Sequence, residues 1–210
     1  MLEKSDKEKL ENYIDKIIKD IKSITKRNIH NGMTDKEIIN SVINITINKF
    51  TPESKSILSS TYNMLKEQTL AEEKYSSSKN EAAFYEMNIS KELNNKFNFD
   101  VPNKIDYKES KETINKWIKA GVVVVTGGVI SIKLKSLIPI GIATIIAGIM
   151  LILIKDKQIS SGNIEMIVDE YLSNVKKSMM AWIISIEKYY DEKMEELNKK
   201  IEELERELVE

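Results

Sequence analysis

Few residues of this chain belong to the types that carry out chemistry in proteins. The sequence has no cysteine and a single histidine, His30. The absence of cysteine excludes disulfides, thiolate zinc sites and thiol nucleophiles. A single histidine disfavours a Ser–His–Asp triad or a metal site built from several histidines. His30 lies between Asn28 and Gly32, in sequence typical of a helix end. We therefore expect it to interact with carbonyl groups there rather than act as a base.

Sequence motifs for phosphate, nucleotide and metal binding are also missing. The sequence has no Walker loop, Gly-rich dinucleotide fingerprint, HExxH pair or EF-hand loop. Gly127-Gly128 lies in apolar sequence, without a phosphate-binding lysine at a suitable spacing. Carboxylates alternate with lysines along the expected helices, a pattern typical of solvated faces. We therefore expect a protein that is not an enzyme and has no cofactor and no metal site.

The charge balance disfavours nucleic acid as a partner. Lys and Arg number 32 and Asp and Glu number 33, which gives a net charge of −1. Arginine, which suits bidentate phosphate recognition, occurs only at Arg27 and Arg206. A nucleic-acid-binding domain usually carries a basic excess. The abundance of Lys, Asn and Ile is typical of an AT-rich genome.

Composition predicts an all-α fold of long amphipathic helices that form a bundle. Seven glycines and three prolines in 210 residues leave few signals for turns. The expected parts are an N-terminal amphipathic module (1–100), a linker with a lead-in helix (101–117), an apolar stretch (118–154) and a long C-terminal helix (155–210). The first 30 residues are charged throughout, so we expect no secretory signal peptide.

Two helix starts in the N-terminal module carry the same signal. Ser5 and Glu8 have the spacing of a capping box, and so do Thr34 and Glu37. Each pair precedes apolar residues at steps of three and four, which predicts an amphipathic helix.

Proline provides a third expected start. Thr51-Pro52 predicts a helix with Thr51 as its cap and Pro52 at its first position. This helix would run to about Phe97. Its polar middle, residues 72–80, predicts a break or a solvated stretch.

The apolar stretch has the length of a membrane hairpin. Ile118–Leu134 has 17 residues and Leu137–Ile154 has 18, and Lys135-Ser136 is the polar gap between them. As helices, each would be about 26 Å long, near the lower limit for crossing a bilayer core. The outer flanks of the hairpin carry more lysines than its turn does. This difference predicts that both termini lie in the cytoplasm. Five residues are expected at the membrane interface, four lysines and one tryptophan: Trp117, Lys119, Lys133, Lys135 and Lys155.

Glycine spacing supports a pairing of these two helices. Folding the hairpin between its halves places Gly121 opposite Gly148 and Gly128 opposite Gly141. Ala143 and Ala147 widen the small face of the second helix. Small residues at facing positions allow close approach of helices in lipid.

The first half of the apolar stretch also has the pattern of a strand. Val122–Val125 is a β-branched run, and Ile130, Ile132 and Leu134 alternate with polar residues. Gly127-Gly128 would then be a turn or a bulge. In a soluble state this half could be β-like, with residues 138–154 as a helix.

Such a layout resembles the α-helical pore-forming toxins of the cytolysin and tripartite enterotoxin kind, which carry an apolar tongue or hairpin between long amphipathic helices. The resemblance is one of architecture, covers the apolar stretch and its flanking helices, and includes no residue motif. It implies a soluble bundle that hides an apolar hairpin and later inserts it into a target membrane.

The C-terminal helix carries a heptad-like seam with one stutter. The seam packs either on other helices of this chain or in an intermolecular coiled coil. The charged last twenty residues favour the coiled coil. Its apolar members are mostly spaced three and four apart: Val175, Met179, Trp182, Ile186, Tyr190, Leu197, Ile201, Leu204 and Leu208.

These patterns together predict a non-enzymatic membrane protein. A two-helix hairpin would anchor it in the lipid bilayer, and its amphipathic helices would bind a second copy or another helical protein. The alternative is a toxin-like, membrane-permeabilising protein that is soluble before insertion.

Overall fold

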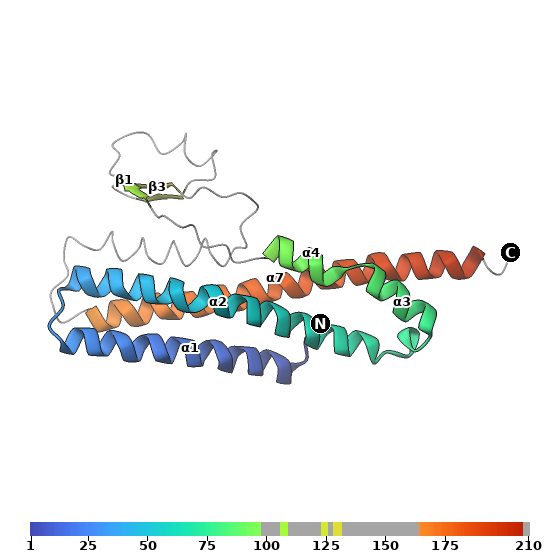
Figure 1. Cartoon of the computed structure of the whole chain (residues 1–210), viewed down its shortest axis with the longest axis horizontal. Coiled ribbons are helices and arrows are strands. Elements are labelled where there is room, and N and C mark those ends of the chain that lie inside the picture. Colours follow the sequence, from blue (N-terminus) through green and yellow to red (C-terminus); the bar gives the residue numbers. More distant parts are fainter. Residues whose placement is uncertain (98–105, 109–122, 126–127, 132–163, 208–210) are drawn as a thin grey trace.

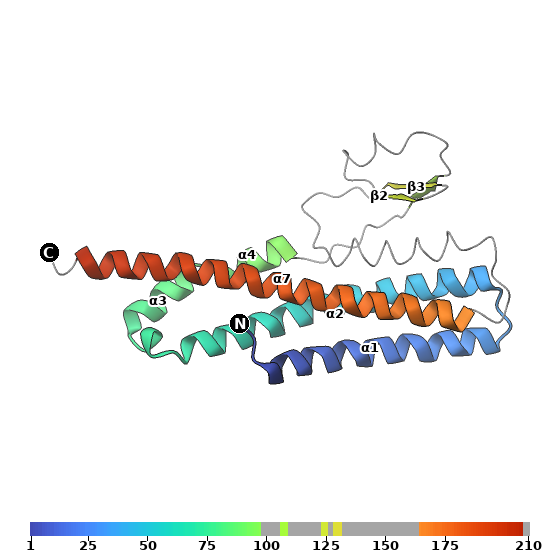
Figure 2. The same ribbon diagram turned by 180° about the vertical axis from the view of Figure 1, so that it is seen from behind.

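A computed structural model of the chain describes residues 1–97, 106–108, 123–125, 128–131 and 164–207. Its helices are α1 (Lys4–His30), α2 (Asp35–Leu70), the one-turn 3₁₀-helix η1 (Glu73–Tyr75), α3 (Ser78–Glu86), α4 (Ile89–Phe97) and α7 (Ile164–Glu207). Figures 1 and 2 show α1, α2 and α7 side by side, with α3 and α4 along the second half of α7. The predicted helical bundle with a long C-terminal helix is confirmed.

The first helix starts earlier than its capping signal predicts. Glu3 is the N-cap residue and forms no side-chain cap bond, whereas Ser5 lies inside the helix. The prediction of Ser5 as the cap is wrong because the chain before it is already fixed. The side chain of Leu2 is buried, and its backbone N–H donates to Glu187 Oε1 of α7 over 2.6 Å.

The capping box predicted for the second helix is confirmed. The backbone N–H of Glu37 donates to Thr34 Oγ1 over 3.4 Å, and the N–H of Thr34 donates to Glu37 Oε2 over 2.8 Å. The turn before it depends on Gly32, which has a φ of +76°. Glycine adopts this left-handed conformation at little cost.

No third helix begins at Pro52, because α2 continues through it. The prediction fails because packing on both sides of the proline outweighs its local effect. Phe50 and Ile57 are buried in the core, at 0% and 1% exposure. The hydroxyl of Thr51 donates to the carbonyl of Ile47 over 2.7 Å instead of capping a new helix.

The predicted break in the polar segment is confirmed. α2 ends at Leu70, η1 follows, and Ser77 caps α3 by accepting a hydrogen bond from the Asn80 N–H over 3.3 Å. A second break, between α3 and α4, was not expected. Asn88 has a φ of +50° there, a left-handed conformation that asparagine tolerates better than most residues.

The seam of α7 packs on helices of its own chain. Its described members lie in one hydrophobic cluster with residues of α1, α2, η1, α3 and α4, which matches the first of the two interpretations. The side chains of Leu204 and Leu208 lie outside what the structure describes. Seven members of the seam are at most 2% exposed: Val175, Met179, Trp182, Ile186, Tyr190, Leu197 and Ile201.

Part of the apolar stretch forms strands. β1 (Asp106–Lys108), β2 (Val123–Val125) and β3 (Gly128–Ser131) make an antiparallel sheet in the order β1-β3-β2. These strands agree with the β-like alternative for the first half and not with a continuous helix over Ile118–Leu134, and the packing role of Gly128 in a membrane stays a prediction. The β-branched run and the period of two favour extended backbone over helix here.

Among the helices that the structure describes, none combines the length and apolarity needed to cross a bilayer. The predicted transmembrane hairpin thus has no support in those parts of the chain. Its second half, Leu137–Ile154, lies outside the described residues. So do most of the expected packing and interface residues: Gly121, Gly141, Gly148, Ala143, Ala147, Trp117, Lys119, Lys133, Lys135 and Lys155.

Candidate functional site

The candidate site is the pair of places where residues 98–163 join the bundle. This segment contains the apolar stretch. It follows α4 at Phe97 and precedes α7 at Ile164. Phe97 packs on Tyr189 of α7, so both places lie on the same helix. At 1.5 Å per residue, the positions 164 and 189 are about 37 Å apart along α7.

α4 is a short helix held by one apolar stripe. Ile89, Leu93 and Phe97 follow one another at steps of four, and their exposures are 1%, 0% and 6%. A helix of nine residues is too short to be stable alone. Its stability therefore depends on these contacts with the bundle and on the polar contacts beside them.

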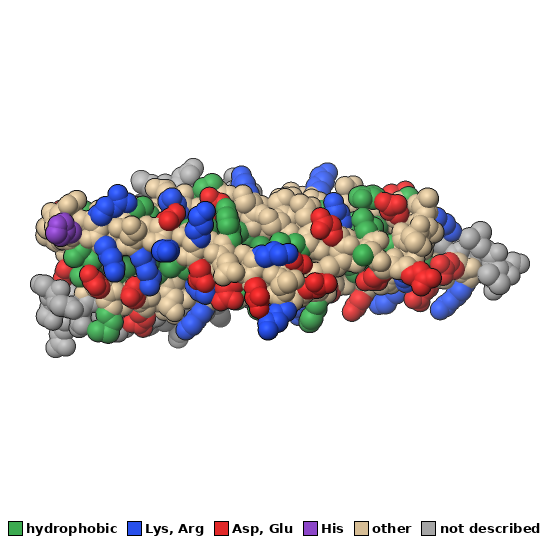
Figure 3. All heavy atoms as spheres, turned by 90° about the horizontal axis from the view of Figure 1, so that it is seen from below, with side chains coloured by type: hydrophobic (Ala, Val, Ile, Leu, Met, Phe, Trp, Pro, Cys, Tyr) green, Lys and Arg blue, Asp and Glu red, His purple; other side chains and the backbone are tan. Residues whose placement is uncertain are grey.

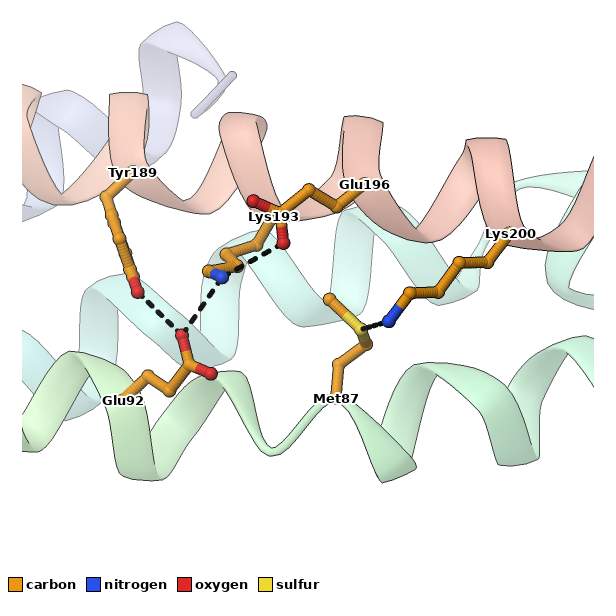
Figure 4. Close-up of polar contacts among 6 residues, drawn as sticks. All are labelled: Met87, Glu92, Tyr189, Lys193, Glu196 and Lys200. Carbon is orange, nitrogen blue, oxygen red and sulfur yellow. Dashed lines mark hydrogen bonds and ion pairs between the residues drawn. The ribbon is translucent and has the colours of Figure 1, made fainter.

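A polar cluster, which we call the clasp, joins α4 to α7 (Figure 4). Tyr189 Oη donates to Glu92 Oε2 over 2.6 Å, and Lys193 Nζ lies 3.3 Å from the same oxygen. Lys193 also pairs with Glu196 Oε2 at 2.9 Å. The clasp is therefore a single carboxylate on α4 that is held by two donors on α7.

The charges of the clasp stabilise one another. The Tyr189 hydroxyl, and then the Lys193 ammonium, hold the pKa of Glu92 below its usual value. Burial, and then the Glu92 carboxylate, raise the pKa of Tyr189. The hydrogen bond to Glu196 is the largest effect that raises the pKa of Lys193. Each group thus keeps its ordinary protonation state near neutral pH.

Aromatic and sulfur contacts flank the clasp. The rings of Phe97 and Tyr189 meet edge to face, with centroids 5.7 Å apart. Lys96 Nζ lies 3.8 Å from the centroid of the Tyr189 ring, a cation–π distance. Farther along, Lys200 Nζ lies 4.0 Å from the sulfur of Met87. Tyr189 therefore makes the most varied contacts at this end of the site.

The other end of the site, at the start of α7, is held mainly by apolar contacts. Ile164 and Val168 are each 4% exposed. One ion pair, between Lys22 and Asp169 at 2.8 Å, joins this part of α7 to α1. A small pocket of about 120 Å³ lies beside it, and its lining includes Lys26 and Glu165. Its charges have both signs, so it does not favour a ligand of either sign.

A second polar cluster lies halfway along α7, where the first residues of the chain meet it. Glu187 is buried and accepts from the Leu2 N–H, and Lys7 Nζ lies 3.2 Å from its carboxylate. One turn later, the hydroxyls of Tyr190 and Thr69 are 2.8 Å apart beside a pocket of about 200 Å³. These contacts satisfy the buried polar groups of Glu187, Tyr190 and Thr69.

The residue types that could act in catalysis or metal binding are not gathered at the candidate site. His30 is exposed in the last turn of α1, and within the described part of the chain its imidazole forms no hydrogen bond, so the expected contact with carbonyl groups is wrong. Across the described residues, no group of three or more His, Asp and Glu side chains is placed to hold a metal ion.

Sequence reasoning missed the clasp altogether. Glu92, Lys96 and Lys193 belong to an alternation of acids and bases that was interpreted as a solvated face. A useful signal was Tyr189, an aromatic residue next to a seam position. Tyr189 and Tyr190 together give α7 a second apolar face at the level where α4 docks.

Comparison of the chain with protein-family models, curated proteins and solved structures gave no match. A function for this chain therefore has to be inferred from its own residues and geometry.

Proposed function

We propose that this chain is a non-enzymatic protein that associates with a lipid bilayer through residues 118–154, while the helical bundle stays in the aqueous phase. The observation that carries the proposal is the contrast between these two parts. Residues 118–154 contain three charged residues, all lysines, whereas the chain as a whole is 31% charged. The helices α1, α2 and α7 bury their apolar residues in a core and expose mostly polar ones.

The position of the apolar stretch supports this proposal. It lies between two bundle helices, α4 and α7, so the bundle holds it at both ends. A protein arranged in this way can place an apolar segment in lipid without placing its core there. Binding of a second copy or of another helical protein is part of the proposal, and the outer surface of the bundle is where it would occur.

Vesicle flotation of the full-length protein tests the proposal. We expect the protein to float with neutral phosphatidylcholine vesicles and to remain with them after an alkaline carbonate wash. A matched variant that replaces four apolar residues of 140–153 by serine should stay at the bottom of the gradient. Recovery of the unmodified protein wholly in the soluble fraction, with no flotation, would contradict the proposal.

A second candidate function is membrane permeabilisation by a protein that is soluble before insertion. The strand pair β2–β3 favours it, because its strands of three and four residues are too short to cross a bilayer. Insertion of this half would therefore require a rearrangement. This candidate also agrees with the architectural resemblance to α-helical pore-forming toxins.

Dye release separates the two candidates. A permeabilising protein is recovered without detergent and empties dye-loaded vesicles in a concentration-dependent way. An anchor binds the same vesicles and leaves them sealed. Variants that lock Val124 to Val129 by a disulfide, at a paired position of β2 and β3, should block release in the oxidised form and restore it after reduction.

A further inference from the structure

The outer face of α1 carries a stripe of basic residues toward its C-terminal end. Lys16, Lys19 and Lys26 are exposed, and their spacing with Ser23 is three, four and three. Residues at this spacing lie on one face of a helix. Arg27 lies beside them and is exposed too. We call these four basic residues the α1 stripe; Asp20 is the one acidic residue among them.

The α1 stripe differs from nearby lysines in its ion pairing. Within the described part of the chain, none of its four side chains has an ion pair with a carboxylate. This differs from nearby lysines that face α7. Lys22 pairs with Asp169 at 2.8 Å, and Lys176 of α7 pairs with Glu11 and Asp15 of α1, each at 2.8 Å. The stripe is therefore available to an external anion.

Charge is unevenly distributed along the bundle. Figure 3 looks onto the side of α1, where Lys and Arg side chains lie toward the end that carries His30, with Asp and Glu side chains among them. At the opposite end, residues 191–207 of α7 carry twice as many acidic as basic residues. An anionic surface would attract the α1 stripe and repel the acidic end of α7. This polarity sets a preferred orientation of the bundle on such a surface.

The end of the bundle that carries the α1 stripe is also the end nearest to the apolar stretch along the chain. The pair Lys22–Asp169 places the start of α7 beside α1. Residues 155–163 alone separate Ile154, the end of the apolar stretch, from this start. Nine residues reach at most about 30 Å. The α1 stripe therefore lies within reach of any membrane that the apolar stretch enters.

We propose that the α1 stripe is a docking surface for the anionic headgroups of a lipid bilayer, and that it lays the α1 side of the bundle onto the membrane. This inference depends on the proposed function, because it assumes that residues 118–154 bring the chain to lipid. Basic residues close to an anionic membrane each strengthen binding by about fivefold. The contribution falls as salt screens the charges.

Binding to vesicles of two compositions tests the stripe. The full-length protein is compared with the variant Lys16→Gln/Lys19→Gln/Lys26→Gln/Arg27→Gln. A charge-matched control, Lys55→Gln/Lys79→Gln/Lys91→Gln/Lys199→Gln, changes four exposed lysines elsewhere. With vesicles that contain phosphatidylglycerol, we expect the stripe variant to bind at least about tenfold more weakly than the control. With neutral phosphatidylcholine vesicles, the two variants should bind alike.

A site-specific label measures the orientation directly. The chain has no cysteine, so Ser23→Cys gives a single label in the middle of the stripe. Ser59→Cys, at an exposed serine of α2, is the matched control. With a nitroxide quencher on the lipid headgroups, we expect the fluorescence of a dye at position 23 to be quenched more strongly than that of a dye at position 59.

The outcomes separate this inference from the proposed function. Binding to neutral vesicles reports the apolar stretch, and the difference between the stripe variant and the control variant on anionic vesicles reports the stripe. Equal binding of both variants to anionic vesicles, or equal quenching at the two labelled positions, overturns the inference and leaves the proposed function standing. If the stripe variant lost binding to heparin or nucleic acid while its binding to vesicles was unchanged, the inference would also be overturned. Absence of binding to any vesicle overturns both.

Discussion

The two halves of α7 differ in how they are held. Residues 164–186 lie against the long helices α1 and α2 and bury large side chains such as Tyr171 and Trp182, at 1% and 0% exposure. Residues 187–207 meet the first residues of the chain, the end of α2 and the short elements η1, α3 and α4. There, polar contacts such as Tyr189–Glu92 and Tyr75–Asn198 accompany fewer buried apolar side chains than in the first half.

This difference indicates an uneven distribution of stability. Regions with fewer buried apolar contacts open at a lower free energy than the core of the same protein. α4 belongs to such a region, and it directly precedes the segment that contains the apolar stretch. The part of the bundle that is easiest to open is therefore one that holds this segment in place.

The largest expected effect is in the first half of α7. Trp182→Ala removes a fully buried side chain and should lower the free energy of unfolding by about 3–5 kcal/mol. Urea denaturation followed by circular dichroism measures it. Ile184→Ala, at a position that is 58% exposed, is the control and should change stability by less than about 0.5 kcal/mol. A similar loss in both variants would contradict the description of this half.

Leu93→Ala should act more locally. Leu93 is 0% exposed in α4, and its truncation should destabilise the docked helix by about 2–4 kcal/mol. We expect faster hydrogen exchange in α3 and α4, with little change in α1. Asn94→Ala, at an exposed neighbour, should leave exchange unchanged. Equal acceleration in α1 and α4 would mean that the two halves of α7 open together.

Glu92→Gln should weaken the clasp by about 1 kcal/mol, because the carboxylate is partly exposed. The pKa of Glu92 is lowered from 4.5 in the folded protein. The ionised form therefore stabilises docked α4 above about pH 4.5, and this contribution is lost as the pH falls through the lower folded value. Hydrogen exchange of α4 at pH 3 and pH 6 should show this loss in the unmodified protein and a smaller one in Glu92→Gln. Identical pH dependence would exclude this role of the clasp.

The smallest effect is expected from Lys200→Ala, which removes a long contact of 4.0 Å with the sulfur of Met87. A weak contact at an exposed site should contribute less than about 0.5 kcal/mol. Thermal denaturation should give a midpoint close to that of the unmodified protein. A shift as large as that of Glu92→Gln would extend the clasp to Met87 and sharpen its definition.

Local signals predicted much of the bundle and failed where distant contacts compete with them. The Thr34–Glu37 capping box is a complete local unit, so its geometry follows from sequence. Pro52 is an equally clear local signal, but the buried side chains of Phe50 and Ile57 carry α2 through it. At Asn88 the prediction failed in the opposite direction. The sequence pattern there is helical, but a single left-handed residue separates α3 from α4.

The candidate site was less predictable than the fold. The apolar stretch is visible in the sequence, and its first half satisfies helical length and strand period at once, so periodicity alone leaves both open. The clasp depends on a contact between residues 97 positions apart, Glu92 and Tyr189. Nothing in the local charge pattern distinguishes Glu92 from the solvated carboxylates around it.

Because α7 is one unbroken helix, the distance between the two attachment points of residues 98–163 is fixed. The two attachment points, about 37 Å apart along one rigid helix, can be bridged by about eleven extended residues. Residues 98–163 are far more numerous than that, so the chain is long enough for the apolar stretch to reach a membrane while both attachment points stay fixed. Transfer into a membrane is therefore compatible with an intact bundle.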